Sequence, residues 1–254
     1  MNDSSFVKLA AGTAPYLRLV YFPHGGGGPS ACRGWLEQLP PEIESWALCL
    51  PGRETRAHLP STVSLDPLID ALVTDLNALS PLPSVFVGHS LGAALAVELA
   101  AALCRTNAHA RMPLKLILSG RLPPHARYPV DMLSLEDDAF VTELIRMGGV
   151  PAPLAAEPLH LAAFLPRIRA DYHLNHATIG RSIEPLDIPI TVVNGRHDSL
   201  VDAAEVEAWR RYTRREFRNV WVDGGHFFPY QNTACFLALL RSELATVFDS
   251  IVSP

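Results

Sequence analysis

The chain of 254 residues lacks the patterns that mark several large classes of protein. Its four cysteines, at positions 32, 49, 104 and 235, form no C-x-x-C pair, which argues against a zinc knuckle, a redox motif or a disulfide scaffold. We expect them to be buried single thiols. The net charge is only −5, so no strong field draws the chain to nucleic acid or to anionic lipid. We expect no nucleic-acid partner, and a monomer is the default.

Long apolar runs are also missing. The N-terminal segment has no basic region followed by a continuous apolar stretch, as a secretory signal would require. The most apolar stretch, residues 91–104, contains Glu98 and is shorter than the roughly 20 residues that cross a bilayer. We therefore expect a cytoplasmic protein with no membrane partner.

What the sequence does contain is a regular alternation of apolar runs and helical periods. We expect strands over residues 17–22, 46–50, 85–88, 114–119, 190–194 and 216–222, and helices over residues 65–79, 91–105, 202–213 and 233–247. Such alternation is typical of a mostly parallel α/β sheet flanked by helices.

The alternation breaks between about residues 123 and 189. This stretch holds nine prolines, helical pieces at 139–147 and 159–171, and no convincing strand. An insertion between two parallel strands usually lies above their carboxyl ends, where open α/β sheets bind ligands. We predict one α/β domain over residues 1–254 with a helical lid over approximately 123–189; a small second domain without a gating role is the alternative.

The sharpest motif is G-x-S-x-G at residues 88–92. It follows the apolar strand SVFV and opens a helix, the strand–turn–helix context that exposes a nucleophilic serine. A turn this tight strains the backbone of Ser90, and the flanking glycines leave room for the neighbouring strand and helix. The alternative is a serine that caps an ordinary helix.

A nucleophilic serine needs a histidine base and an acid that orients it. In this architecture the acid precedes the histidine, and both follow later strands. Asp198 and His226 fit as the acid and the base. Competing residues lie close to them in the sequence, namely His197, Asp223 and Asp202, of which Asp202 resembles the N-cap of the predicted helix 202–213. A turn-forming aspartate and a surface histidine remain alternatives for the chosen pair.

Four glycines follow the strand predicted at 17–22. The sequence F-P-H-G-G-G-G at residues 22–28 is comparable to the H-G-G-G loops that supply an oxyanion hole. We predict that the backbone N–H groups of Gly25 and Leu91 form this hole. A phosphate-binding loop is the rival interpretation, but the Lys-Ser/Thr that ends a P-loop is missing.

Two further clusters have mainly structural explanations. His173 and His176 lie three residues apart, but a metal site would need more ligands, and we predict no metal and no cofactor. The arginines at positions 210, 211, 214, 215 and 218 form a basic run that is either a solvated face or a docking site for an acidic partner.

Taken together, these motifs match a family. The residues F-P-H-G-G-G-G at 22–28, L-P-G-R-E-T-R at 50–56, G-H-S-L-G at 88–92, N-G-R-H-D at 194–198 and G-G-H-F-F at 224–228 resemble type II thioesterases. These are the stand-alone editing thioesterases of nonribosomal peptide and polyketide synthesis, including siderophore clusters. The resemblance covers nearly the whole chain. The family loop commonly reads P-H-A-G-G, and here Gly25 replaces the alanine.

The resemblance implies an α/β-hydrolase fold and hydrolysis of acyl or aminoacyl thioesters from the phosphopantetheine arm of carrier proteins. Ser90, Asp198 and His226 would be catalytic, and phosphopantetheine would enter only as part of the substrate. Carrier proteins or carrier domains of a synthase would be the partners, with the basic run and Arg53 or Arg56 as docking residues. A small-molecule carboxylesterase or lipase-like hydrolase and a non-catalytic carrier- or ligand-binding protein are the alternatives.

Overall fold

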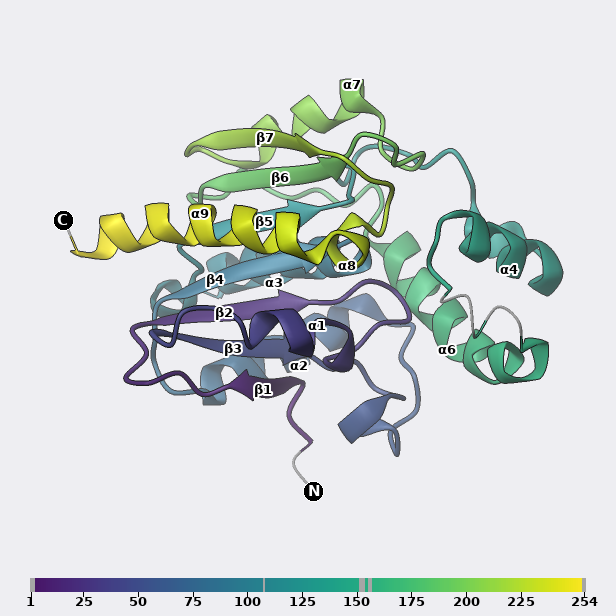
Figure 1. Cartoon of the computed structure of the whole chain (residues 1–254), viewed down its shortest axis with the longest axis horizontal. Helices are drawn as coiled ribbons and strands as arrows, with labels where there is room; N and C mark the ends of the chain where they lie inside the picture. Colours follow the sequence, from purple (N-terminus) through teal and green to yellow (C-terminus); the bar gives the residue numbers. More distant parts are fainter. Residues whose placement is uncertain (1–2, 107, 151–153, 155–156, 253–254) are drawn as a thin grey trace.

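The computed structural model describes residues 3–106, 108–150, 154 and 157–252. Within them, seven strands form one sheet in the order β1-β3-β2-β4-β5-β6-β7 (Figure 1). The strands are β1 (Phe6–Ala10), β2 (Leu17–Phe22), β3 (Ile43–Leu48), β4 (Ser84–His89), β5 (Lys115–Ser119), β6 (Ile190–Gly195) and β7 (Phe217–Val222). Only β1 runs antiparallel to its neighbour. The predicted mostly parallel α/β sheet is confirmed.

Alternating side chains bury both faces of this sheet. Along β2, Leu19 and Tyr21 enter one apolar core and Val20 and Phe22 enter the other, as the two-residue period of a strand requires. Helices α2 (Leu65–Ala78) and α3 (Leu91–Arg105) cover the face of Val20, and α1 (Ser30–Leu36) and α9 (Thr233–Val252) cover the face of Tyr21. No helix of the described residues is both long enough and apolar enough to cross a membrane.

The chain between β5 and β6 forms a separate helical layer. It contains α4 (Asp137–Arg146) and α6 (Pro158–Ala177), which lie beyond the carboxyl ends of the strands (Figure 1). A small apolar core of its own holds this layer together, made by Met132, Phe140, Leu144, Met147 and Leu165. The two helical pieces predicted here are present, and α6 continues past its predicted end to Ala177.

Some predicted elements differ from the structure. A continuous helix over 202–213 is wrong, because a short α7 (Ala203–Val206) passes into a 3₁₀ helix over Glu207–Tyr212. The tighter turn aligns residues three apart, which lets both Trp209 and Tyr212 enter the core. Strand β1 was not predicted from the sequence, since its five residues include a charged Lys8 and it pairs only at the sheet edge.

The cysteines differ from expectation at two positions. Cys32 and Cys49 are buried as predicted, but Cys104 and Cys235 are exposed. Cys104 lies in the last turn of α3 and Cys235 in the first turns of α9. Cys104 directly follows the last buried residue of α3, and Cys235 lies on the exposed side of α9, so both thiols face solvent.

Candidate active site

Ser90 lies at the turn between β4 and α3 with a strained backbone. Its φ of 54° and ψ of −118° are values that a residue with a side chain adopts at a cost of about 1–3 kcal/mol. The turn is held on the sheet because the N–H of Ser90 donates to the Ser119 carbonyl at 2.8 Å. The strain predicted from the motif is therefore present.

The two glycines of the motif are required by close backbone approach. A Cβ on Gly88 would lie 2.5 Å from the Cα of Ala93 in the following helix. A Cβ on Gly92 would lie 1.8 Å from the carbonyl oxygen of Phe22 in the neighbouring strand. Any larger residue would force the helix away from the sheet and move Ser90.

Asp198 and His226 form a buried pair at the ends of β6 and β7. The Nδ1 of His226 lies 2.7 Å from Oδ2 of Asp198, and both residues are about 6% exposed. The other carboxylate oxygen, Oδ1, accepts the N–H of Leu200 at 2.9 Å. Since a carboxylate can only accept, Nδ1 carries the proton and Nε2 is left to exchange one.

The competing residues are placed elsewhere. His197 and Asp223 form an exposed pair of their own, with Nε2 to Oδ1 at 3.2 Å and side chains 72% and 86% exposed. The carboxylate of Asp202 accepts the N–H of Ala204 at 2.9 Å and caps α7. The structure thus pairs the predicted acid with the predicted base rather than either with a competitor.

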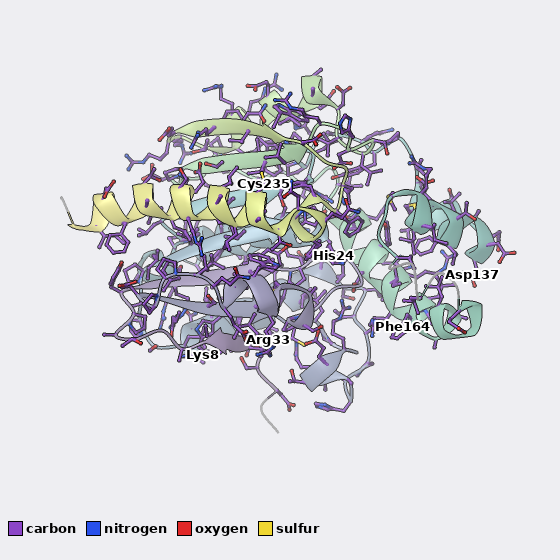
Figure 2. The ribbon with its side chains drawn as sticks, viewed as in Figure 1. Lys8, His24, Arg33, Asp137, Phe164 and Cys235 are labelled. Carbon is purple, nitrogen blue, oxygen red and sulfur yellow. The ribbon has the colours of Figure 1, made fainter. Side chains whose placement is uncertain are left out.

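A cavity of about 1390 Å³ brings the predicted site residues together. Ser90, Leu91, Gly25 and His226 line one side. The other side comes from the layer between β5 and β6, with the apolar Leu144, Met147, Leu161, Phe164 and Ile168 beside the charged Arg167 and Asp171. Figure 2 shows Phe164 and Asp137 on that layer and His24 at the end of the sheet that faces it.

The two predicted oxyanion donors are neighbours in space. A Cβ built on Gly25 would lie 4.0 Å from Cδ2 of Leu91. In the described part of the chain, no acceptor takes the backbone N–H of either residue. Backbone N–H groups without an internal acceptor are what an oxyanion hole requires, and the positions of Gly25 and Leu91 are compatible with that prediction.

A buried ion pair that the sequence did not reveal holds the glycine loop. Arg53 donates from Nη1 and Nη2 to the two oxygens of Asp171 at 2.8 and 2.6 Å. Arg53 also donates to the Gly27 carbonyl at 2.7 Å, and Asp171 accepts the Gly26 N–H at 2.6 Å. Side-chain exposures are only 3% and 2%. The loop is therefore clamped between the L-P-G-R-E-T-R segment and α6.

These contacts overturn the expectation that Arg53 or Arg56 docks a partner. Arg53 is enclosed by the clamp, and Arg56 is 8% exposed and donates to the Cys49 carbonyl at 2.9 Å. Neither guanidinium is available at the surface. The L-P-G-R-E-T-R motif pointed to a functional role for Arg53. Its partner Asp171 lies 118 positions away, and no sequence motif linked the two residues.

The basic run at 210–218 lies away from the cavity. His226 follows the carboxyl end of β7, whereas Arg214 and Arg215 precede its first residue. Arg215 pairs with Asp187, with Nε to Oδ1 at 2.5 Å, and Arg218 pairs with Glu243. Because the basic run begins at the opposite end of β7 from His226, its position gives no support to a docking role at the cavity.

Two further imidazoles, those of His24 and His89, lie close to the Asp198–His226 pair. The His89 ring centroid lies 5.0 Å from that of His226 and 6.2 Å from that of His24. Burial, followed by the nearby His226, lowers the pKa of His24 to about 3 and the pKa of His89 well below its usual value. Both rings are therefore neutral near pH 7 and add no charge beside His226.

Polar contacts hold both neutral rings in place. His24 Nδ1 lies 2.8 Å from the hydroxyl of Tyr230, and His89 Nδ1 lies 2.8 Å from the hydroxyl of Ser119. Among the described residues, no group of three or more His, Cys, Asp or Glu side chains could hold a metal.

Comparison with known proteins assigns the class. The family described as Thioesterase domain matches residues 17–242. The gramicidin S biosynthesis protein GrsT of Aneurinibacillus migulanus is 34% identical over 244 residues, which cover 95% of this chain and 94% of that protein. The probable anguibactin biosynthesis thioesterase AngT of Vibrio anguillarum is 29% identical, with 94% and 97% covered.

Solved structures agree with the sequence comparison. YbtT, a type II thioesterase from the yersiniabactin NRPS/PKS biosynthetic pathway, superposes with a TM-score of 0.83 at 30% identity, covering 93% of this chain and 96% of that one. RedJ, the thioesterase from the prodiginine pathway in Streptomyces coelicolor, superposes with a TM-score of 0.83 at 33% identity, covering 91% of each chain.

The chain belongs to the thioesterase family and, within it, to the type II thioesterases of nonribosomal peptide and polyketide biosynthesis. Its fold is the α/β-hydrolase fold of these relatives. The protein is therefore a hydrolase of thioesters, and the non-catalytic alternative is set aside.

Proposed function

We propose that this protein removes acyl or aminoacyl groups from the phosphopantetheine arm of carrier proteins through an acyl-enzyme on Ser90. One observation carries the proposal: His226, whose Nδ1 lies 2.7 Å from Oδ2 of the buried Asp198, lines the same cavity as the strained Ser90. A serine alone is a poor nucleophile, and this arrangement supplies the base and the acid that it needs.

In the first half-reaction, Ser90 Oγ attacks the thioester carbonyl while Nε2 of His226 takes the hydroxyl proton. The carbonyl oxygen becomes an oxyanion that accepts the N–H groups of Gly25 and Leu91, each donor being worth about 2.7–4 kcal/mol in other hydrolases. The C–S bond then breaks, and His226 returns the proton to the departing thiolate. The acyl group remains as an ester on Ser90.

In the second half-reaction, water replaces the thiol. His226 takes a proton from water as its oxygen attacks the ester carbonyl, and the same two N–H groups hold the oxyanion. The C–O bond to Ser90 breaks, and His226 returns the proton to Ser90 Oγ. Throughout, Asp198 holds the imidazole orientation and stabilises its charged form. The products are a free acid and the regenerated serine.

We assign Arg53 and Asp171 as positioning residues in this reaction. Their ion pair fixes Gly26 and Gly27, the residues that directly follow the proposed donor Gly25. Preorganised donors stabilise an oxyanion without having to move during the reaction. Because Asp171 belongs to α6, the geometry of the hole depends on where this helix lies.

The carrier-protein substrate is supported by the relatives and by the cavity. YbtT is named as a type II thioesterase of an NRPS/PKS pathway and ClbQ as a protein of another such pathway, and in these pathways acyl groups are carried on pantetheine arms. The cavity, at about 1390 Å³, is large enough for an acyl chain and part of the arm. We further propose that residues 123–189 act as a lid over this cavity in a single domain, and that the protein works as a cytoplasmic monomer without a cofactor.

The decisive experiment measures hydrolysis of an acyl carrier protein beside hydrolysis of a p-nitrophenyl ester, with Ser90→Ala as the control variant. Release of the acyl group from the carrier that is lost in Ser90→Ala supports the proposal. Cleavage of the ester without cleavage of the carrier thioester would instead indicate a small-molecule esterase. Unchanged carrier hydrolysis in Ser90→Ala would overturn the assignment of the nucleophile.

A further inference from the structure

One arginine on the cavity wall has no acceptor. Arg167 lines the cavity, and no hydrogen bond or ion pair joins its guanidinium to any residue in the described part of the chain. Its Nε is fully buried without a partner. The side chain is held against the ring of Phe164, with the guanidinium carbon 4.8 Å from the ring centroid. Arg167 is thus a positioned but unpaired donor.

Of the other arginines of this layer, Arg121 is held by Asn175 and Thr178 and Arg127 is exposed, whereas Arg169 and Arg146 are paired with carboxylates. Arg169, two residues along α6, donates from Nε to Oδ1 of Asp137 at 2.8 Å. Arg146 on α4 donates from Nε to Oε2 of Glu143 at 2.8 Å. The residues that the structure does not describe, 1–2, 107, 151–153, 155–156 and 253–254, include no Asp and no Glu. None of the undescribed positions therefore supplies an acidic side chain that could pair with Arg167.

Two carboxylates, Asp171 and Glu54, act through their charge on Arg167, but both are already bound by other groups. Asp171 is held by Arg53 and by the glycine loop. Glu54 accepts the hydroxyl of Ser30 at 2.7 Å. Burial, followed by the positive charge of Arg53, lowers the pKa of Arg167, although an arginine stays charged near pH 7. A half-buried cation without an acceptor is unfavourable, and an anionic ligand would remove that cost.

Arg167 also lies on the helix face that adjoins the reacting centre. A Cβ on Gly26 would be 3.4 Å from Cγ1 of Ile168, and one on Gly25 would be 3.7 Å from Cβ of Asp171. Residues four positions apart lie on the same helix face, separated by about one turn of 5.4 Å. Arg167 therefore lies one turn before Asp171 on the same side of α6. Ser90 and Arg167 line the same cavity, so a substrate held at Ser90 occupies the cavity that the guanidinium borders.

We propose that Arg167 is a substrate-binding residue that recognises an oxyanion carried by the thioester substrate. The oxyanion is either the phosphate of the pantetheine arm or a carboxylate on the acyl group, and a guanidinium binds both in the same bidentate manner. This inference rests on the proposed function, because it places the acyl carbonyl at Ser90.

Two matched pairs of substrates separate the two sources. Isovaleryl-pantetheine and isovaleryl-phosphopantetheine differ only in the phosphate. Isovaleryl-pantetheine and malonyl-pantetheine differ in a carboxylate that replaces a branched end of similar shape. The variants are Arg167→Gln, which removes the charge, Arg167→Lys, which keeps it, and Arg169→Gln as the matched control, since Arg169 is bound by Asp137.

We expect Arg167→Gln to lower kcat/KM about tenfold for the charged member of one pair and to leave the neutral member unchanged. Arg167→Lys should restore part of the loss, and Arg169→Gln should change neither ratio. A loss confined to the phosphate pair identifies the arm as the source, and a loss confined to the malonyl pair identifies the acyl group. Equal effects of Arg167→Gln on charged and neutral members of both pairs would overturn the proposal.

A binding measurement keeps this test separate from the proposed function. Calorimetry compares phosphopantetheine with pantetheine, and malonate with isovalerate, on wild type and on Arg167→Gln. If wild type hydrolyses none of the thioesters, the proposed function fails, whereas weaker anion binding by Arg167→Gln still supports the Arg167 site. Equal anion binding by the two proteins would refute it.

Discussion

The clamp between Arg53 and Asp171 leads to the sharpest prediction, the effect of Asp171→Asn. The wild-type carboxylate takes three short hydrogen bonds, two from Arg53 at 2.8 and 2.6 Å and one from the Gly26 N–H at 2.6 Å. An amide has nearly the same shape but only one oxygen, and its NH₂ group would face a donor. The variant therefore keeps at most part of the clamp and leaves Arg53 buried without a counter-charge.

The magnitude follows from two separate losses. Removing the charge of one partner of a buried ion pair costs about 3–5 kcal/mol of folding stability. This range applies because the side chains of Arg53 and Asp171 are both nearly inaccessible to solvent. If the glycine loop then moves so that the Gly25 N–H no longer meets the oxyanion, kcat falls by about 10²–10³, the effect of removing one donor in other hydrolases. We expect little change in KM for a small thioester, because the lost interaction acts on the transition state.

The assay measures kcat and KM on a neutral small thioester at a temperature where the variant is fully folded, together with the urea midpoint. Asp137→Asn is the matched control, since Asp137 pairs with Arg169 on α6 but is 67% exposed. An exposed pair of this kind contributes only about 0–1 kcal/mol. A folded Asp171→Asn protein with wild-type kcat would refute the positioning role and leave the clamp a purely structural contact.

Two further predictions concern the histidines. His226→Ala should lower kcat by at least about 10³. His197→Ala should be nearly silent, because His197 lies two residues past the end of β6 but is exposed and paired only with Asp223; comparable losses in thioester hydrolysis would contradict the choice of base. Burial lowers the pKa of His24 to about 3. Between pH 6.5 and 3, the imidazole of His24 therefore binds a proton in the unfolded chain but not in the folded protein. The free energy of unfolding should fall as the pH drops through this range, by up to about 1.4 kcal/mol per pH unit. Urea midpoints measured across this range should fall less steeply for His24→Gln than for wild type, and parallel curves would exclude this contribution.

Local chemistry made much of the fold and site predictable. The alternation of apolar runs with helical periods predicts the parallel sheet because strand and helix periods are properties of the backbone. The motif around Ser90 predicts its strained turn because only glycine fits where a Cβ on Gly92 would lie 1.8 Å from a carbonyl oxygen. The chain order of serine, acid and histidine predicted Asp198 and His226, and the structure places these two in contact.

Other features depended on contacts between distant segments. The continuous helix predicted at 202–213 gave way to a 3₁₀ turn because Trp209 and Tyr212 both pack into the core. Arg53 was expected at the surface, as most arginines are. It is buried because Asp171, 118 positions away, supplies the counter-charge that makes burial possible.

The sequence by itself thus determined the class of fold and the choice of Ser90, Asp198 and His226 as the proposed reacting residues, since both rest on short-range sterics, periodicity and chain order. Only the tertiary structure decided how the reacting residues are held and what surrounds them. It buries Arg53 in the clamp, leaves Arg167 facing the cavity without an acceptor, and keeps His24 and His89 neutral. The physical reason is that burial and charge pairing depend on which distant groups meet, and no local pattern records those meetings.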